Sequence, residues 1–166
     1  MVLVALATAM AGACDGAPTG IESGGARAIV FETAKGTIRA EVYTGYTPLT
    51  AQNFITLVNA GFYDGLTFHR YVPGFIVQGG DPNGDGTGGS GTRIPLEIDS
   101  RITHVKGTLG MARGADLNSA SSQFYITLDA AHHLDGSYAA FGRIIEDMDV
   151  VEQLRPGDRM LRVFVP

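Results

Sequence analysis

The stretch FHRYVPGFIVQGGDP, residues 68–82, limits the fold more than any other part of the chain. It shows neither the continuous apolar run of a buried strand nor the strict alternation of a half-exposed one. Pro73-Gly74 divides it into two arms, and Gly79-Gly80 lets the backbone leave the second arm at angles that a side chain would forbid. We therefore expect two short arms that meet at a tight turn.

If the second arm is extended from Phe75, its side chains alternate between two faces. Ile76 and Gln78 then share one face. Phe75 and Val77 share the other face, and Arg70 arrives from the first arm. An arginine beside apolar side chains has two interpretations: its stem covers a hydrophobic strand at the surface, or its guanidinium stands beside a shallow apolar pocket. The second arrangement would suit the binding of a carbonyl oxygen next to an apolar group.

Length, charge and cysteine content exclude several classes of protein. The chain has 166 residues, enough for one domain with a substantial core. Its net charge of −5 and the lack of a Lys/Arg cluster argue against nucleic acid as a partner. The single cysteine, Cys14, excludes an internal disulfide, and no Cys/His spacing of the zinc kind occurs. We expect neither a metal nor a cofactor.

The first 14 residues resemble an export signal. Residues 1–13 are apolar or small except for Thr8, and as a helix they would span only about 20 Å, too short to cross a membrane. A signal-peptide core fits this length, although the usual positive n-region is missing. The segment Ala11 to Cys14 resembles a lipoprotein cleavage box. We expect an exported protein, periplasmic or tethered to a membrane through a lipid on Cys14; without a functional signal it would be cytoplasmic.

The remaining sequence divides into a linker and one domain. Residues 15–27 are rich in Gly, Pro and Ser and form a flexible linker before the domain at 28–166. A helix begins at Thr47-Pro48, with Thr47 as N-cap, and a short second helix has Asp147 as its cap. Alternating residues predict strands at 28–32, 38–43, 109–112, 123–127, 138–145 and 160–165, besides the two arms. No β-α-β alternation occurs, so we expect an all-β fold: a closed, eight-stranded antiparallel barrel capped by two α-helices.

The glycine-rich segment 81–95 partly matches three ligand-binding motifs, and each match fails. A calcium loop that starts at Asp81 would need glutamate at its twelfth position, which is Thr92. The glycine spacing of a dinucleotide fingerprint is present, but no helix follows it. A phosphate loop would need Lys-Ser or Lys-Thr after the glycines. We therefore expect a long surface loop.

Three segments together resemble the cyclophilin family of peptidyl-prolyl cis-trans isomerases, in particular its short bacterial members. They are GFYDGLTFHRYVPGFIVQGGDP (61–82), GTLGMARGADLNSASSQFYI (107–126) and HLDGSYAAFGRIIEDMDVVE (133–152). The likeness covers nearly all of residues 28–165, and its first block is highly specific. The family fold, an eight-stranded antiparallel barrel closed by two helices, agrees with the elements expected above.

The resemblance also implies the site. Arg70 is similar to the catalytic arginine of the family, and Gln78 to the residue that supports it. The implied walls of the proline pocket are Phe75, Ile76, Tyr125 and Leu134. The implied groove for the residues on either side of the proline is lined by His69, Ala112, Arg113, Gln123 and Tyr138.

Several of these positions differ from the best-known members. Ile76 stands where Met is common, Tyr125 where Phe is common, and Tyr138 replaces a His. These changes keep an apolar or aromatic wall, so isomerase activity is still expected. His133 takes the place of a Trp that helps to hold cyclosporin, so the resemblance implies weak cyclosporin binding. Arg113, where Asn is common, should alter the groove mildly.

The chemistry of an X-Pro bond suits such a site. Rotation must break amide resonance over a barrier of about 20 kcal/mol, but it transfers no proton and makes no bond. We expect an isomerase that acts on proline-containing peptides and unfolded protein clients, as a monomer. The alternative is a non-catalytic module that binds proline segments or acts as a chaperone on the same barrel. A serine hydrolase is disfavoured because Gly89-Ser90-Gly91 lacks the spacing of a nucleophile elbow.

Overall fold

The computed structural model describes residues 25–166. The expected leader, Cys14 and most of the expected linker lie outside the described residues. The first strand begins at Ala26, two residues before the expected start of the domain at Ala28. The elements are β1 (Ala26–Thr33), β2 (Gly36–Tyr43), α1 (Pro48–Asn59), β3 (Phe68–Val72), β4 (Ile76–Gly79), β5 (Thr108–Met111), β6 (Phe124–Thr127), the 3₁₀ helix η1 (His132–Leu134), β7 (Ala140–Glu146), α2 (Met148–Gln153) and β8 (Met160–Phe164). Neither α-helix of residues 25–166 is long and apolar enough to span a membrane.

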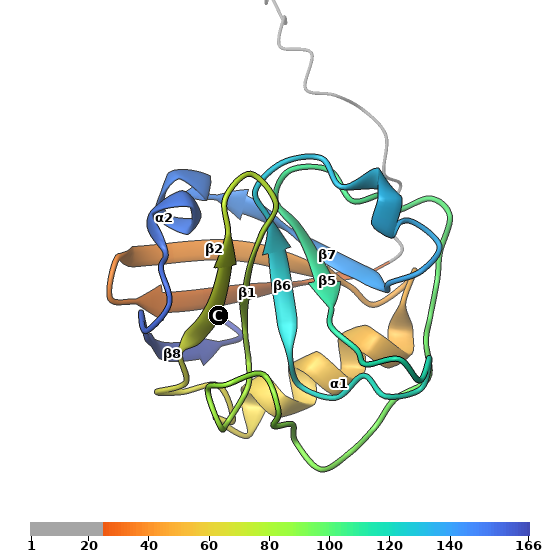
Figure 1. The fold of residues 1–166 in the computed structure, drawn as a ribbon, viewed down its shortest axis with the longest axis horizontal. Coiled ribbons are helices and arrows are strands. Elements are labelled where there is room, and N and C mark those ends of the chain that lie inside the picture. The colour runs from red at the N-terminus through yellow and green to blue at the C-terminus, as the bar shows by residue number, and fades with distance from the viewer. Residues whose placement is uncertain (1–24) are drawn as a thin grey trace, which may run out of the picture.

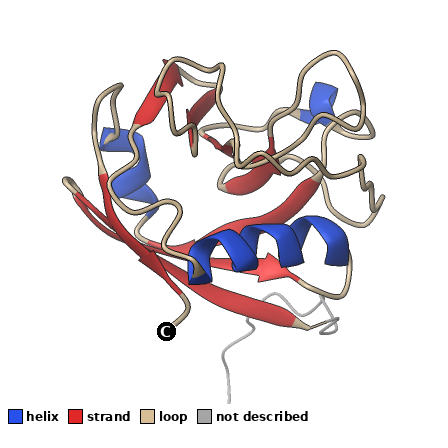
Figure 2. Ribbon diagram, turned by 90° about the horizontal axis from the view of Figure 1, so that it is seen from below, coloured by secondary structure: helices blue, strands red, loops and turns tan. Residues whose placement is uncertain are grey.

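The eight strands form one antiparallel sheet in the order β3-β4-β6-β5-β7-β2-β1-β8 (Figure 1). Side chains of β2 alternate between the core and solvent, as at buried Ile38 and exposed Arg39. This two-residue period is the one that the sequence shows, because one face of each strand packs on the core. The two α-helices cover opposite ends of the sheet, and α1 crosses the end that faces the viewer in Figure 2.

The sheet curls strongly but is not a closed barrel, so the expected closure is overstated. The edge strands β3 and β8 share no ladder. The gap is spanned by the segment that precedes β3, through an isolated bridge between Thr67 and Arg159. Beside this bridge, Gly65 N donates to Met160 O at 2.7 Å, and Met160 N donates to Leu66 O at 2.9 Å. The result is a curled half-barrel with its last seam held by a few backbone hydrogen bonds.

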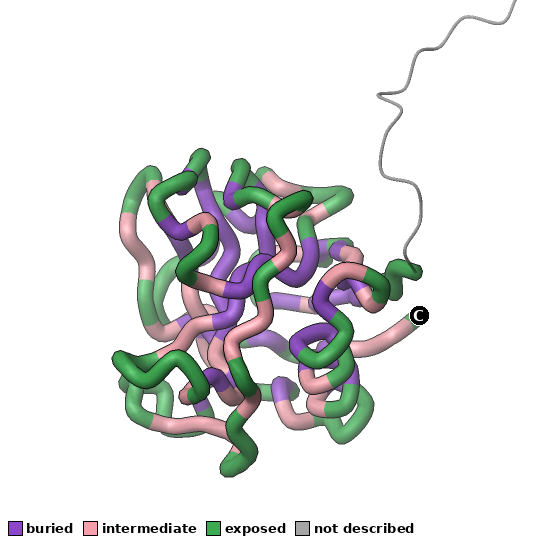
Figure 3. The backbone as a smooth tube through the Cα atoms, turned by 90° about the vertical axis from the view of Figure 1, so that its right-hand side faces the viewer, coloured by how far each residue is buried: buried purple, intermediate pink, exposed green. Residues whose placement is uncertain are grey.

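Aromatic rings fill the interior of the curled sheet. Phe54 of α1 lies at their centre, with ring centroids 5.0 Å from Tyr63, 5.1 Å from Phe141 and 5.4 Å from Phe124. All four side chains are buried, and Figure 3 shows buried residues in the interior of the domain with exposed residues at its outer turns. Such pairs contribute about 0.5–1.5 kcal/mol each beyond the burial of their area. The interior of the curled sheet is therefore a packed core, and the site must lie on its outer surface.

Thr47 and Asp147 occupy the expected N-cap positions of α1 and α2, but neither side chain makes a cap hydrogen bond. Instead, the carboxylate of Glu97 accepts from Leu49 N at 3.2 Å and Thr50 N at 2.9 Å, and so satisfies two free N–H groups of α1. Asp147 also makes no cap hydrogen bond, because it adopts a left-handed conformation with φ 64° at the turn from β7 into α2.

Candidate active site

The hairpin of β3 and β4 places Arg70 directly opposite Gln78. A register shift lies between Phe68 and Arg70, so the intervening His69 is an extra residue in β3. Phe68 consequently points into the core, and Arg70 points to the exposed side of the sheet. Arg70 Nη1 donates to Gln78 Oε1 at 3.1 Å. The pairing of these two residues, expected from the resemblance, is present in the fold.

Phe75 lies in the turn before β4, and its N–H donates to Val72 O at 3.0 Å. The expectation that Phe75 shares a face with Val77 is therefore wrong, because the alternation of β4 begins only at Ile76. Val77 belongs to the main core, whereas Phe75 packs in a second, smaller cluster with Ile76.

This second cluster forms the floor and walls of a hollow of about 240 Å³, here called the apolar hollow. The apolar hollow is lined by every predicted site residue except His69 and Gln123. Its lining is Arg70, Phe75, Ile76, Gln78, Ala112, Arg113, Tyr125, Leu134 and Tyr138. Apolar and aromatic side chains thus surround a volume suited to a small ring, and the side chains of Arg70 and Arg113 also line it.

A second hollow of about 270 Å³, here called the polar hollow, adjoins the first. The two share Gln78, Ala112 and Arg113 as lining residues. The remaining lining of the polar hollow is Gly86, Thr87, Gly88, Gly114, Ser119, Ser121 and Gln123. The predicted groove residue Gln123 therefore lies beside the apolar hollow, in a continuous groove made of both parts.

A chain of hydrogen bonds connects Arg70 to the loop after β4. Gln123 Nε2 donates to the backbone carbonyls of Gly86 and Gly88, both at 2.9 Å. Gln123 Oε1 in turn accepts from Gln78 Nε2 at 2.9 Å, and Gln78 Oε1 accepts from Arg70. Because the backbone carbonyls can only accept, they fix the orientation of both amides and leave an oxygen facing the guanidinium.

Tyr125 forms one wall of the apolar hollow and is anchored from behind. Its hydroxyl lies 2.8 Å from Nε2 of the buried His104, whose Nδ1 lies 2.8 Å from Asp135 Oδ1. Asp135 also accepts from the backbone N–H of His104 at 2.7 Å. Burial lowers the pKa of His104, although the bond to Asp135 opposes this shift. A neutral His104 can donate to Asp135 and accept from the tyrosine hydroxyl.

The ring of Tyr125 packs directly against Gly110 of β5. A Cβ added at Gly110 would lie 2.1 Å from the tyrosine ring, closer than any real contact. Glycine is therefore required at this position so that the ring can seat against the sheet. The resulting wall is fixed on one side by backbone and at its tip by His104.

Comparison with known proteins identifies the family. Residues 28–162 match the family described as cyclophilin type peptidyl-prolyl cis-trans isomerase/CLD. The chain belongs to this family. A peptidyl-prolyl cis-trans isomerase of Synechococcus elongatus is 49% identical over 138 residues, which cover 82% of this chain and 94% of that protein. Peptidyl-prolyl cis-trans isomerase B of Bacillus subtilis is 43% identical over 129 residues, which cover 77% and 90%.

A solved structure agrees with this assignment. The crystal structure of a Cryptosporidium parvum cyclophilin type isomerase, obtained in the presence of the dipeptide Ala-Pro, gives a TM-score of 0.79 at 28% identity. The match covers 84% of this chain and 99% of that one. The cyclophilin fold expected from the sequence is therefore confirmed.

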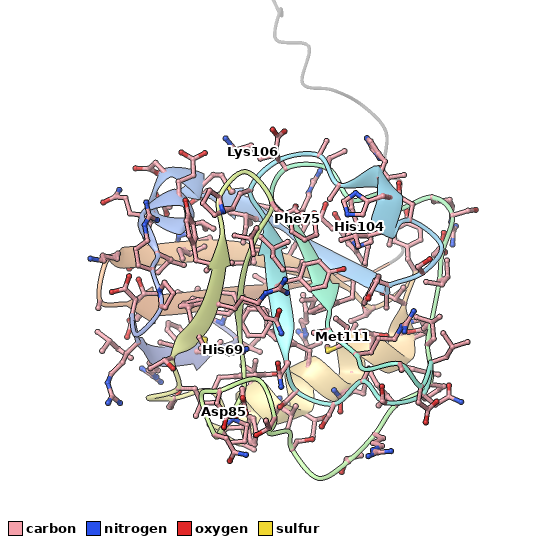
Figure 4. The ribbon with its side chains drawn as sticks, viewed as in Figure 1. His69, Phe75, Asp85, His104, Lys106 and Met111 are labelled. Carbon is pink, nitrogen blue, oxygen red and sulfur yellow. The ribbon has the colours of Figure 1, made fainter. Side chains whose placement is uncertain are left out.

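His69 is the predicted groove residue that lines neither hollow of this cyclophilin. Figure 4 shows it beside the loop that carries Asp85 and well apart from Phe75. Both ring nitrogens are buried without a hydrogen-bond partner, and burial lowers the pKa of His69. As the extra residue of the β3 register shift, it is turned away from Arg70 and under this loop.

Sequence reasoning missed His104 and Asp135, which lie outside the quoted wall and groove positions. One signal could have suggested them. A tyrosine at the cyclophilin pocket position where Phe is common brings a hydroxyl into a buried setting, and a buried hydroxyl requires a partner. Among residues 25–166, no group of three His, Cys, Asp or Glu side chains could hold a metal ion.

Proposed function

We propose that this cyclophilin accelerates cis-trans rotation about X-Pro peptide bonds, with the proline ring in the apolar hollow and Arg70 at the reacting amide. The observation that carries the proposal is the guanidinium of Arg70 at the edge of a hollow walled by Phe75 and Tyr125. The isomerase names of the bacterial relatives support the same activity.

The residues of the hollow suit this reaction in the following way. The apolar walls bind the proline ring and remove water from the amide, which destabilises the charge-separated planar form relative to the twisted one. In the twisted amide the nitrogen regains a lone pair, to which an N–H of Arg70 donates. An acceleration of about 10⁵-fold corresponds to about 7 kcal/mol, which one fixed cation and desolvation together can supply.

Replacement of Arg70 tests this role against a purely binding function. Arg70→Ala should lower kcat/KM on a proline peptide by about 100-fold or more, because the transition-state donor is lost. Arg70→Lys should restore only part of the rate, since a point charge lacks the planar fork. Arg162, an exposed arginine stacked on Phe164, provides the matched control, and Arg162→Ala should leave the rate unchanged. Equal rates for wild type and Arg70→Ala would instead favour a non-catalytic binding module.

The substrates that fit are proline-containing peptides and unfolded protein clients, so the protein would assist folding. A hollow of this size and open form admits a proline on a flexible chain. The Cryptosporidium parvum relative, solved in the presence of Ala-Pro, supports this class. Refolding of a client limited by proline isomerisation, with and without the enzyme, measures it directly. We also propose that the protein acts as a monomer, which light scattering would check.

Weak binding of cyclosporin is part of the same proposal. His133 stands where the resemblance expects Trp, and its ring centroid lies 5.3 Å from that of Phe75 at the rim of the hollow. An imidazole covers less apolar area than an indole and so contributes less to the binding of a large apolar ligand. His133→Trp should therefore tighten cyclosporin binding; an unchanged Kd would contradict this explanation.

We further propose that the protein is exported and tethered through a lipid on Cys14. The support comes from the sequence alone, namely the apolar start and the residues that precede Cys14. Mass spectrometry of the mature N-terminus from the native host decides the point. A mature chain that begins at an acylated Cys14 supports the tether, and one that begins at Met1 contradicts export.

A further inference from the structure

Arg113 stands at the seam of the groove, in the lining of both the apolar and the polar hollow. The only charged side chains that line either hollow are Arg70 and Arg113, and no Asp or Glu joins them. The described residues of the groove are thus cationic in a chain whose net charge is −5. A local field of this sign favours an anionic group on the bound peptide.

The guanidinium of Arg113 is held in place without being neutralised. Its Nε and Nη2 donate to Ser137 O at 3.1 and 2.8 Å, and its Nη1 donates to Gly114 O at 2.9 Å. It also stacks on Tyr138, with Cζ 4.5 Å from the ring centroid. These partners are uncharged carbonyls and a ring, so they orient the cation and leave its charge in place. Three of the five N–H donors are used, which leaves two for a ligand.

Ion pairing divides the twelve Lys and Arg side chains of residues 25–166 into two groups, and Arg113 belongs to the group that has no acidic partner. Lys35, Arg39, Arg101, Lys106 and Arg143 each form an ion pair with a nearby carboxylate. Arg113 forms none, although it is half-buried and fixed. A preorganised guanidinium with free donors is a strong site for a carboxylate, because little rotamer entropy is lost on binding.

We infer that Arg113 makes this isomerase prefer peptides with an acidic side chain, Asp or Glu, close to the proline. The inference rests on the proposed function, since it assumes that the proline occupies the apolar hollow. Arg113 lines that same hollow, so the carboxylate belongs to a residue within about two positions of the proline, given about 3.3 Å per residue of extended chain. The preference is for a carboxylate because the guanidinium binds it in a planar, two-point fashion.

The test compares matched peptides that differ in one atom group, Glu against Gln. Four pairs carry the change at each of the two positions before and the two positions after the proline. Turnover is measured by exchange NMR, and Kd is measured by titration on the same samples. In wild type, at least one position should show a Glu:Gln ratio of about three- to tenfold in kcat/KM, as expected for one charge-assisted hydrogen-bonded pair. The ratio should shrink at 1 M salt, where the Debye length is about 3 Å.

Three variants separate the contribution of Arg113 from general charge. Arg113→Gln should bring the ratio close to one, and Arg113→Lys should keep part of it because the charge remains. Arg162→Gln removes the same charge at a distance from the groove and should leave the ratio as in wild type. Thermal unfolding of each variant verifies that it folds, and Arg113→Lys still provides the comparison if Arg113→Gln does not.

Each outcome decides one of the two proposals. A Glu:Gln ratio near or below one at all four positions in wild type overturns the preference, and so does a ratio that survives in Arg113→Gln. If wild type turns over none of the Gln peptides, the proposed function fails, and the Kd ratios then decide the preference on their own. A ratio that appears in wild type and in Arg162→Gln, shrinks in Arg113→Lys and disappears in Arg113→Gln supports the inference.

Discussion

Replacement of Gln123 by glutamate would reveal whether the loop after β4 holds Arg70 in its working position. Glutamate keeps the length of the side chain, but it cannot donate to the carbonyls of Gly86 and Gly88, which Gln123 contacts at 2.9 Å each. Each lost hydrogen bond costs about 0.5–1.5 kcal/mol, so the free energy of unfolding should fall by about 1–3 kcal/mol. Urea denaturation measures this first effect.

The effect on catalysis arises separately, through the orientation of Gln78. Among the described residues, the guanidinium of Arg70 has one hydrogen-bond partner, Gln78 Oε1. Once Gln123 no longer fixes the amide of Gln78, that oxygen need not face Arg70. Fixing an arginine side chain in one rotamer costs about 2 kcal/mol of conformational entropy. Partial release of Arg70 should therefore weaken transition-state binding by about 1.4 kcal/mol, which is a tenfold fall in kcat/KM.

A protease-coupled proline-peptide assay measures this fall, and Asn53 provides the control. Asn53 Nδ2 donates to Ser121 O at 2.7 Å, so Asn53→Asp also removes an amide donor from a backbone carbonyl. Asn53 makes no hydrogen bond to Gln78 or Arg70, so this variant should lose about 1 kcal/mol of stability while kcat/KM stays within twofold of wild type. The reasoning is refuted if Gln123→Glu is destabilised and yet matches wild type in kcat/KM.

Two further predictions follow from burial. Gly110→Ala should destabilise the protein by about 1–3 kcal/mol and lower kcat/KM, because the new Cβ collides with the ring of Tyr125, which must shift; urea denaturation and the same assay check this, and unchanged values would contradict the close packing. Burial lowers the pKa of both His69 and His104 below the usual value of about 6.5. Between that value and the folded-state pKa the unfolded chain binds more protons, so the free energy of unfolding should fall as pH drops from 7 to 5. A flat profile at constant ionic strength would contradict it.

Much of the fold could be predicted because strands leave a local signal. In β6, Phe124 and Ile126 enter the main core while Tyr125 faces the hollow, as the two-residue period requires. The same period misplaced Phe75, because the rule assumes an extended chain and Phe75 still lies in the turn. Where the backbone leaves the strand conformation, alternation carries no information about direction.

The start of α1 shows a different limit of prediction from sequence, since the side chain that accepts its free N–H groups is distant in sequence. A threonine before a proline is the usual local pattern of a helix start. The hydrogen bonds that Thr47 was expected to supply come instead from Glu97, which lies in the long loop after β4. Only the folded chain brings this carboxylate to α1, so no local pattern could assign it.

The glycine-rich loop resembles calcium and nucleotide motifs because it folds around a charged group, and this group is the carboxylate of Asp81 in the same loop. The carboxylate of Asp81 is buried and accepts the N–H groups of Asn83 at 2.9 Å, Asp85 at 3.1 Å and Gly86 at 2.5 Å. Burial acts to raise the pKa of Asp81, but these hydrogen bonds outweigh it and lower the pKa, so the group stays charged.

Glycine-rich turns of this kind bind anions with successive N–H groups, and here the anion is part of the protein. A Cβ at Gly88 would lie 2.2 Å from Asp81 Oδ1, so the glycine is needed for the loop to close around the carboxylate. Closure around Asp81 presents the carbonyls of Gly86 and Gly88 to Gln123, which orients Gln78 and thereby Arg70. The pattern that suggested an external ligand therefore belongs to the internal support of Arg70.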